Sequence, residues 1–210
     1  LLRGENLQNL VQREGAIAPE RVLAIIAQAC IGLQKAHEGG VIHRDIKLAN
    51  IFLAEGEDDE LVVKLLDFGI AKVRGPAKND ESAELTKTGE VLGSPLYMSP
   101  EQAVSTKNVD HRTDIWSLGV VFYYLLCGRA PFSHCETLSE MLISICSVDP
   151  PRVESISPWV DPEIEKIVRR SVARNVNERY ESAKEMLADI KTLLPNGYAL
   201  APTEHAGVDQ

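Results

Sequence analysis

Apolar residues recur every three or four positions along most of the chain, and this spacing predicts a mainly helical protein. The clearest helix lies within residues 18–40, where Pro19 suits a first turn and Gly39 with Gly40 ends the pattern. Its apolar face would consist of Val22, Ile25, Ile26, Ala29, Leu33 and Ala36.

Residues 113–128 are apolar on almost every side, which predicts a buried helix at the centre of the fold. Other stretches are amphipathic and predict helices with one buried face. These are residues 5–13, 137–146, 161–173 and 182–194.

Two short β-branched and apolar runs, residues 51–53 and 61–66, predict the strands of one β-hairpin. The acidic segment between them fits a solvated turn, since its spacing matches no EF-hand loop. Residues 67–100 have no sustained period, and a loop of that length in a compact domain is usually functional. The expected fold is therefore a helical bundle around one buried helix, with a small hairpin.

Composition narrows the choice of partners. The 210 residues carry a net charge of −9, which argues against nucleic acid or an anionic membrane as the main partner. The four cysteines form no C-x-x-C pair, so we expect reduced thiols in a cytoplasmic protein. The five histidines suggest no zinc site, and the longest apolar run is too short to span a bilayer.

The candidate chemistry lies at the two ends of the hairpin. Residues 43–50 read "HRDIKLAN" and place Asp45, Lys47 and Asn50 before the first strand, while Asp67 follows the second strand. Oxygen ligands from an amide and a carboxylate suit Mg²⁺, and a further carboxylate and an ammonium suit a hydroxyl and a phosphoryl group. This set favours phosphoryl transfer, which is catalysed by positioning and charge neutralisation.

Five motifs in one order extend this reading over nearly the whole chain. After "HRDIKLAN" come "LLDFG" at residues 65–69, "GSPLYMSPE" at 93–101, "DIWSLG" at 114–119 and "RNVNERY" at 174–180. Together they resemble the large, C-terminal lobe of a eukaryotic-type protein kinase, of the serine/threonine branch found in bacteria. The resemblance implies that residues 1–195 are that lobe, part of a two-lobed α+β fold, and that 196–210 form a mobile polar tail.

The resemblance also assigns roles at the site. Asp45 would accept or orient the proton of the substrate hydroxyl, and Lys47 would steady the γ-phosphate of ATP. Asn50 and Asp67 would hold Mg²⁺. Phe52 would contact the adenine, and Leu2 would be one of the last residues of the hinge beside the nucleotide.

Further residues are assigned supporting roles by the same resemblance. Asp114 would fix the backbone of the "HRD" segment, and His43 is expected to be a packed structural residue. Glu101 and Arg179 would form a buried ion pair. Arg44 would bind a phosphate added to the long loop, for which the candidates are Thr86 and Thr88.

Serine/threonine specificity follows from Lys47 and from Ser94 in "GSPLY", since tyrosine kinases commonly differ at both places. The family usually has Pro-Glu or Pro-Ala between the lysine and the asparagine, where this chain has Leu48 and Ala49. Ala49 is familiar in the bacterial branch, while Leu48 gives up the fixed φ of proline, and we expect a minor effect on the loop.

No glycine-rich phosphate loop and no "VAIK" lysine occur in these 210 residues. The chain taken alone is therefore expected to bind ATP poorly and to be nearly inactive. Dimerisation through the missing small lobe and a membrane anchor elsewhere both stay open. Two other functions also remain: a kinase-like binding module that no longer catalyses, and a kinase of small molecules, against which "GSPLYMSPE" and "DIWSLG" argue.

Overall fold

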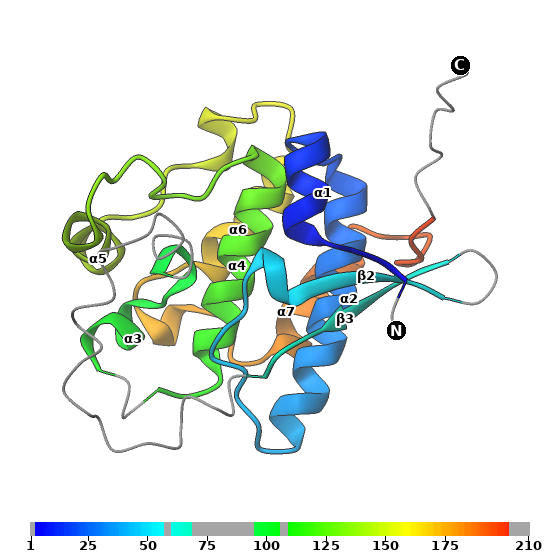
Figure 1. Ribbon diagram of the computed structural model, residues 1–210, viewed down its shortest axis with the longest axis horizontal. Coiled ribbons are helices and arrows are strands. Elements are labelled where there is room, and N and C mark those ends of the chain that lie inside the picture. The colour runs from blue at the N-terminus through cyan, green and yellow to red at the C-terminus, as the bar shows by residue number, and fades with distance from the viewer. Residues whose placement is uncertain (1–2, 57–59, 69–94, 106–108, 202–210) are drawn as a thin grey trace.

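A buried helix, α4 (Arg112–Cys127), lies at the centre of the molecule, with the other elements packed around it (Figure 1). The computed structural model describes residues 3–56, 60–68, 95–105 and 109–201. Thirteen of the 16 residues of α4 are buried, which confirms the prediction of a central helix without a solvent face. Gly128 ends it in the left-handed conformation, with φ 70°, that favours glycine.

The remaining helices match the predicted amphipathic stretches to within a few residues. They are α1 (Leu7–Glu14), α2 (Pro19–Glu38), α5 (Leu138–Ser147), α6 (Pro162–Ser171) and α7 (Ala183–Thr192). A short helix, α3 (Pro100–Val104), was not predicted because five residues are too few to show a period.

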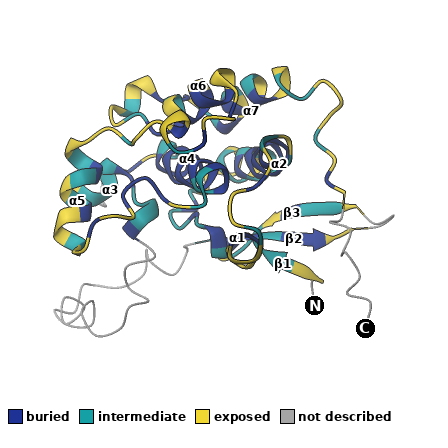
Figure 2. Cartoon of the chain, turned by 90° about the horizontal axis from the view of Figure 1, so that it is seen from above, coloured by how far each residue is buried: buried dark blue, intermediate teal, exposed yellow. Residues whose placement is uncertain are grey.

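The helices lie in levels, which are visible from above in Figure 2. Helices α6 and α7 form the upper level, α4 and α2 the middle one, and α1 with the sheet the lower one. Helix α2 packs on α7 and on the sheet, and α4 packs on α2 and α6. The main core is shared by these elements, while a second cluster around Trp116, Phe132 and Met141 joins α4 to α5.

The sheet has three antiparallel strands in the order β1 (Gly4–Asn6), β2 (Ile51–Glu55) and β3 (Leu61–Leu65). The predicted hairpin of β2 and β3 is confirmed. The prediction of a helix from residue 5 is wrong at its start, because Glu5 and Asn6 belong to β1. Asn6 has extended backbone angles and caps α1 by accepting a hydrogen bond from the Asn9 N–H at 2.9 Å.

Residues 198–201 pack against the body of the protein, although a mobile tail was predicted from residue 196. Leu200 is 3% exposed, and its carbonyl accepts from the Leu61 N–H of β3 at 2.9 Å. The Gln28 side chain joins the two segments, since it accepts from the Val63 N–H and donates to the Tyr198 carbonyl, each at 2.9 Å. This contact could not be read from the polar composition of the segment.

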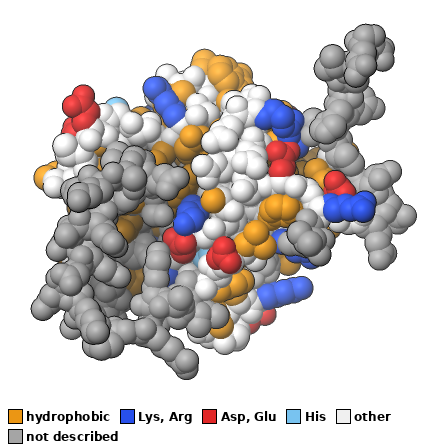
Figure 3. Space-filling view, viewed as in Figure 1, with side chains coloured by type: hydrophobic (Ala, Val, Ile, Leu, Met, Phe, Trp, Pro, Cys, Tyr) orange, Lys and Arg blue, Asp and Glu red, His pale blue; other side chains and the backbone are white. Residues whose placement is uncertain are grey.

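The surface gives no simple sign of a partner. Acidic and basic side chains alternate with apolar ones over the described part of the face shown in Figure 3. Among the helices that the structure describes, none is long and apolar enough to cross a membrane.

The cysteines are all free thiols, and burial raises the pKa of the Cys30 thiol to about 12.

Candidate active site

The segment between α2 and β2, residues 41–47, is held in place by the carboxylate of Asp114 at the start of α4. Its Oδ2 accepts from the His43 N–H and its Oδ1 from the Arg44 N–H, both at 2.8 Å. Asp114 is completely buried, and a buried carboxylate needs such donors to replace water. The expected contact between Asp114 and the "HRD" backbone is therefore present.

Arg44 adopts a strained backbone conformation within this segment. Its φ of 62° lies in the left-handed region, which costs a non-glycine residue on the order of 1–3 kcal/mol. Its N–H points to Asp114, and its carbonyl accepts weakly from the Gln102 side chain of α3 at 3.5 Å. The strain is thus maintained by contacts from two separate helices.

His43 connects the segment to the end of β3. Its Nε2 lies 2.9 Å from the Leu66 carbonyl, and its Nδ1 accepts from the Asp45 N–H at 3.3 Å. These partners require the proton on Nε2. The ring is fully buried and lies beside that of Phe68, with 4.6 Å between the centroids. Since both nitrogens have backbone partners, His43 is positioned as a structural residue.

Asp45, Lys47 and Asn50 lie together where the chain enters β2. The Lys47 ammonium is 3.0 Å from Asp45 Oδ2. The Asn50 amide nitrogen donates to the Asp45 carbonyl at 2.9 Å and to its Oδ2 at 3.1 Å. The Asp45 carboxylate is about one-fifth exposed (19%), so it is oriented by two neighbours and still reaches solvent.

Asp67 is brought beside this group by the register of the hairpin. Ile51 pairs with Leu65, and the Leu66 N–H donates to the Asn50 carbonyl at 2.9 Å, which leaves Asp67 as the next residue. Its φ of 52° is again left-handed. The Asp67 side chain is exposed, and it has no hydrogen-bond or ion-pair partner in the part of the chain that the structure describes.

The donor set at this place fits a magnesium ion. The amide nitrogen of Asn50 is occupied by Asp45, so the amide oxygen is the atom available to a cation. The carboxylate of Asp67 supplies further oxygen atoms. Mg²⁺ prefers one or two such protein ligands, with phosphate and water as the others.

The other predicted ligand contacts are only partly described. Phe52 of β2 is half-buried, on the face of the strand opposite to Leu53. Leu2, Thr86 and Thr88 lie outside the described residues, as does most of the long loop at 67–100. Arg44 is half-buried.

Glu101 of α3 and Arg179, which follows α6, form the expected ion pair. Two parallel hydrogen bonds of 2.6 and 2.7 Å join the guanidinium to the carboxylate. The guanidinium also donates to the carbonyls of Ala173, Arg112 and Arg174 and lies over the Trp116 ring. Burial alone would raise the pKa of Glu101, but the bonds to Arg179 outweigh it and lower this pKa below its usual value.

Two residues that hold the site in place were not predicted from the sequence. His37, near the end of α2, donates from Nε2 to Asp114 Oδ2 at 2.8 Å. Ser99 caps α3 and shares a 2.8 Å hydrogen bond with Thr113 of α4. The "SPEQ" sequence signals the cap of α3. In contrast, nothing in the sequence connects His37 with Asp114, since 77 residues separate them.

Comparison with known proteins agrees with this geometry. Residues 1–190 match the family described as "Protein kinase domain". Serine/threonine-protein kinase PknB of Mycolicibacterium smegmatis is 38% identical over 187 residues, which is 89% of this chain and 28% of PknB. Serine/threonine-protein kinase PknL of Mycobacterium tuberculosis is 37% identical over 193 residues, which is 92% of this chain and 45% of PknL.

A third relative, a probable serine/threonine-protein kinase of Corynebacterium efficiens, is 34% identical, and the match covers 97% of this chain and 30% of the relative. The chain therefore spans less than half the length of these relatives.

Proposed function

Because the chain belongs to the protein kinase domain family, we propose that it provides the phosphoryl-transfer residues of a protein serine/threonine kinase, which uses ATP and acts on protein hydroxyl groups. The observation that carries this proposal is the Asp45 carboxylate, oriented by Lys47 and Asn50 and placed by the hairpin beside Asp67. The names of the relatives support serine and threonine as the residues that accept phosphate.

Asp45 is the residue that receives the substrate. Its partly exposed carboxylate would accept the hydrogen bond of an incoming hydroxyl and take its proton as the hydroxyl oxygen bonds to the γ-phosphorus of ATP and the bond from that phosphorus to ADP breaks. The hydrogen bond from Asn50 fixes the carboxylate in one orientation. The Lys47 ammonium, 3.0 Å away, is close enough to neutralise charge on the transferred group.

Asn50 and Asp67 are the residues that would hold Mg²⁺, and Phe52 with Leu2 would contact the adenine of ATP. When bound, the ion neutralises charge on the phosphates. Asp67 has a left-handed backbone and an exposed side chain, so its carboxylate is accessible to an ion. Since ATP is the phosphate donor, we place the domain in the cytoplasm.

Arg44 is the proposed receptor for a regulatory phosphate on Thr86 or Thr88. A phosphate adds roughly −1.5 to −2 charges and pairs well with a guanidinium. The Arg44 N–H donates to Asp114, which holds this backbone in place, and Asp45 is the next residue along the chain. Autophosphorylation of the long loop would thus act on the backbone beside the catalytic residue.

A direct assay separates this function from that of a silent binding module. The natural full-length protein is incubated with ATP, Mg²⁺ and casein, and the products are analysed for phosphoserine and phosphothreonine. We expect both products to require Mg²⁺, and Asp67→Asn to reduce the rate by about a hundredfold or more. A correctly folded protein that binds a partner and transfers no phosphate supports the binding module instead.

A further inference from the structure

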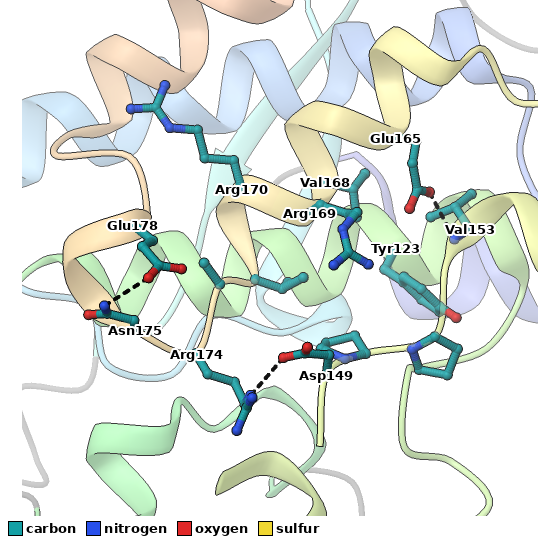
Figure 4. Close-up of a pocket in the computed structure, with 14 residues that line it drawn as sticks. Tyr123, Asp149, Val153, Glu165, Val168, Arg169, Arg170, Arg174, Asn175 and Glu178 are labelled. Carbon is teal, nitrogen blue, oxygen red and sulfur yellow. Dashed lines mark hydrogen bonds and ion pairs between the residues drawn. The ribbon is translucent and has the colours of Figure 1, made fainter. Parts of the chain in front are cut away.

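A cavity of about 570 Å³ lies away from the proposed catalytic residues, between α4, the loop that precedes residue 153, α6 and the segment 173–178. Figure 4 shows the residues that line it. None of them belongs to the proposed catalytic set. The volume is within the usual range of about 300–1,000 Å³ for small-molecule sites.

Two polar atoms of buried side chains in this lining lack hydrogen-bond partners. They are the hydroxyl of Tyr123 on α4, which lies beside the weakly bonding thiol of Cys127, and Oε1 of Glu165 on α6. The residues are 1% and 6% exposed. The other oxygen of Glu165 accepts from the Val153 N–H at 2.8 Å. Since buried polar groups are nearly always paired, two unpaired groups in one cavity indicate a site for a further polar group.

The surroundings of the Glu165 carboxyl offset only part of the effect of its burial. Burial raises the pKa of its carboxyl, although the Val153 N–H and the charge of Arg169 act in the opposite direction. A cationic hydrogen-bond donor beside Glu165 would counter this effect of burial and favour its carboxylate form.

One of the three arginines that line the cavity is available to an anion. Arg174 is paired with Asp149, with 2.7 Å between Nε and Oδ1, and Arg170 is paired with Glu185. Arg169 has no ion pair or hydrogen bond within the described residues, and its guanidinium extends toward the space between Glu165 and Tyr123 in Figure 4. Arg169 follows Glu165 by one helical turn, a separation of about 5–6 Å between Cβ atoms.

From these positions we propose that the cavity binds a small zwitterion, an ammonium group joined to a carboxylate as in a free α-amino acid. The ammonium donates to Glu165 Oε1 and to the Tyr123 hydroxyl, and the carboxylate pairs with Arg169. A simple cation would be repelled by Arg169 and a simple anion by Glu165, so a ligand with both charges fits best. Val168, Val172, Pro150 and Pro151 provide an apolar wall for a side chain.

Calorimetric titration of the natural full-length protein with each of the twenty common L-amino acids tests this site. Ethylamine and acetate, which carry one charge each, serve as ligand controls. We expect saturable binding of at least one amino acid and none of either control at the same concentration. The proposal is overturned if none of the twenty binds, or if ethylamine or acetate binds equally well.

Variants locate the binding. We expect Arg169→Ala and Glu165→Gln each to weaken the binding of the amino acid by about tenfold or more, since each removes one charge-assisted contact. Arg169 is exposed, so its replacement leaves the core intact. Lys166→Ala, on the outer side of the same helix, is the matched control and should bind as the wild type does. Unchanged affinity in both test variants, or a crystal soaked with the amino acid that shows only water at Glu165, contradicts the proposal.

Discussion

At the scale of single residues, the site depends on Asp114, which carries no proposed chemical step. Its carboxylate accepts from two backbone N–H groups and from His37, and these bonds hold Arg44 in its left-handed conformation. The position of Asp45 follows from this backbone, because Asp45 is the next residue. The "DIWSLG" motif indicated this contact, whereas the donation from His37 appears only in the folded chain.

Asp114→Asn is predicted to destabilise the protein by about 1–3 kcal/mol. The asparagine amide keeps one acceptor oxygen, but its NH₂ group would face one of the backbone N–H donors that now bond to the second carboxylate oxygen. Urea unfolding measures this change. Glu163→Gln, in an exposed pair with Lys166, serves as control and should stay within about 0.5 kcal/mol of the wild type. Equal stability of the two variants would argue against a positioning role for Asp114.

The Glu101–Arg179 pair predicts a particular dependence of stability on pH. Because the folded protein lowers the pKa of Glu101, the pair stabilises the fold above the unfolded pKa of about 4.3, and this contribution is lost as the pH falls through the lower folded pKa. The free energy of unfolding of the wild type should therefore fall more steeply between pH 5 and 3 than that of Glu101→Gln. Parallel curves for the two proteins contradict the assignment.

At the scale of elements, the structure depends on the close approach of α4 to α6. Gly119 of α4 has no room for a side chain: an added Cβ would lie 2.3 Å from Ser171 Oγ and 2.8 Å from Val172 Cγ1. This distance explains why a glycine occupies the middle of a buried helix, where it has a cost of its own. The same helix pair forms two walls of the cavity that holds Tyr123 and Glu165.

Gly119→Ala is predicted to destabilise the protein by about 1–3 kcal/mol through overpacking. Gly32→Ala in α2 is the matched control, because its added Cβ would meet only the end of the Leu65 side chain, at 3.1 Å. Thermal unfolding of both variants measures the difference. If Gly119→Ala is as stable as Gly32→Ala, the described packing of α4 on α6 is wrong.

Sequence patterns predicted the long elements well and the short ones poorly. Periodicity identified α2 and α4 because many turns repeat one face, and β2 with β3 followed from β-branched residues. Strand β1 has three residues and merged with the α1 pattern. Its pairing with β2 depends on Gly4, which lets the backbone of Leu53 approach, and such a long-range contact has no local signal.

For the candidate site, the motifs placed Asp45, Asn50 and Asp67 near one another, because a hairpin must bring its two ends together. They did not indicate the cavity around Glu165, whose lining comes from three separate segments, at residues 123, 149–153 and 165–178. Nor could they indicate which polar atoms stay unpaired, since that depends on side-chain geometry.

At the scale of the whole molecule, the C-terminal segment 198–201 covers the edge of β3. Gln28 of α2 is bonded to both β3 and this segment. It therefore protects backbone groups that would otherwise form an open sheet edge.

Gln28→Ala is therefore predicted to speed hydrogen exchange at the Val63 amide, which loses its acceptor, with little effect on amides within α4. Gln34→Ala removes only an exposed bond to Glu38 and is the control. Exchange at Val63 that is the same in both variants would show that the segment is held by other contacts.

The proposed kinase activity depends on the Asp45 carboxylate, and its replacement tests the account most directly. The turnover of the natural full-length protein is compared with that of Asp45→Asn, with ATP, Mg²⁺ and casein at saturating concentrations and Glu163→Gln as control. We predict that kcat falls by about 10²–10⁴-fold in Asp45→Asn, as for loss of a general base, while ATP affinity and the control stay near wild type. Turnover by Asp45→Asn equal to that of the wild type, or no turnover by the wild type itself, would contradict the account.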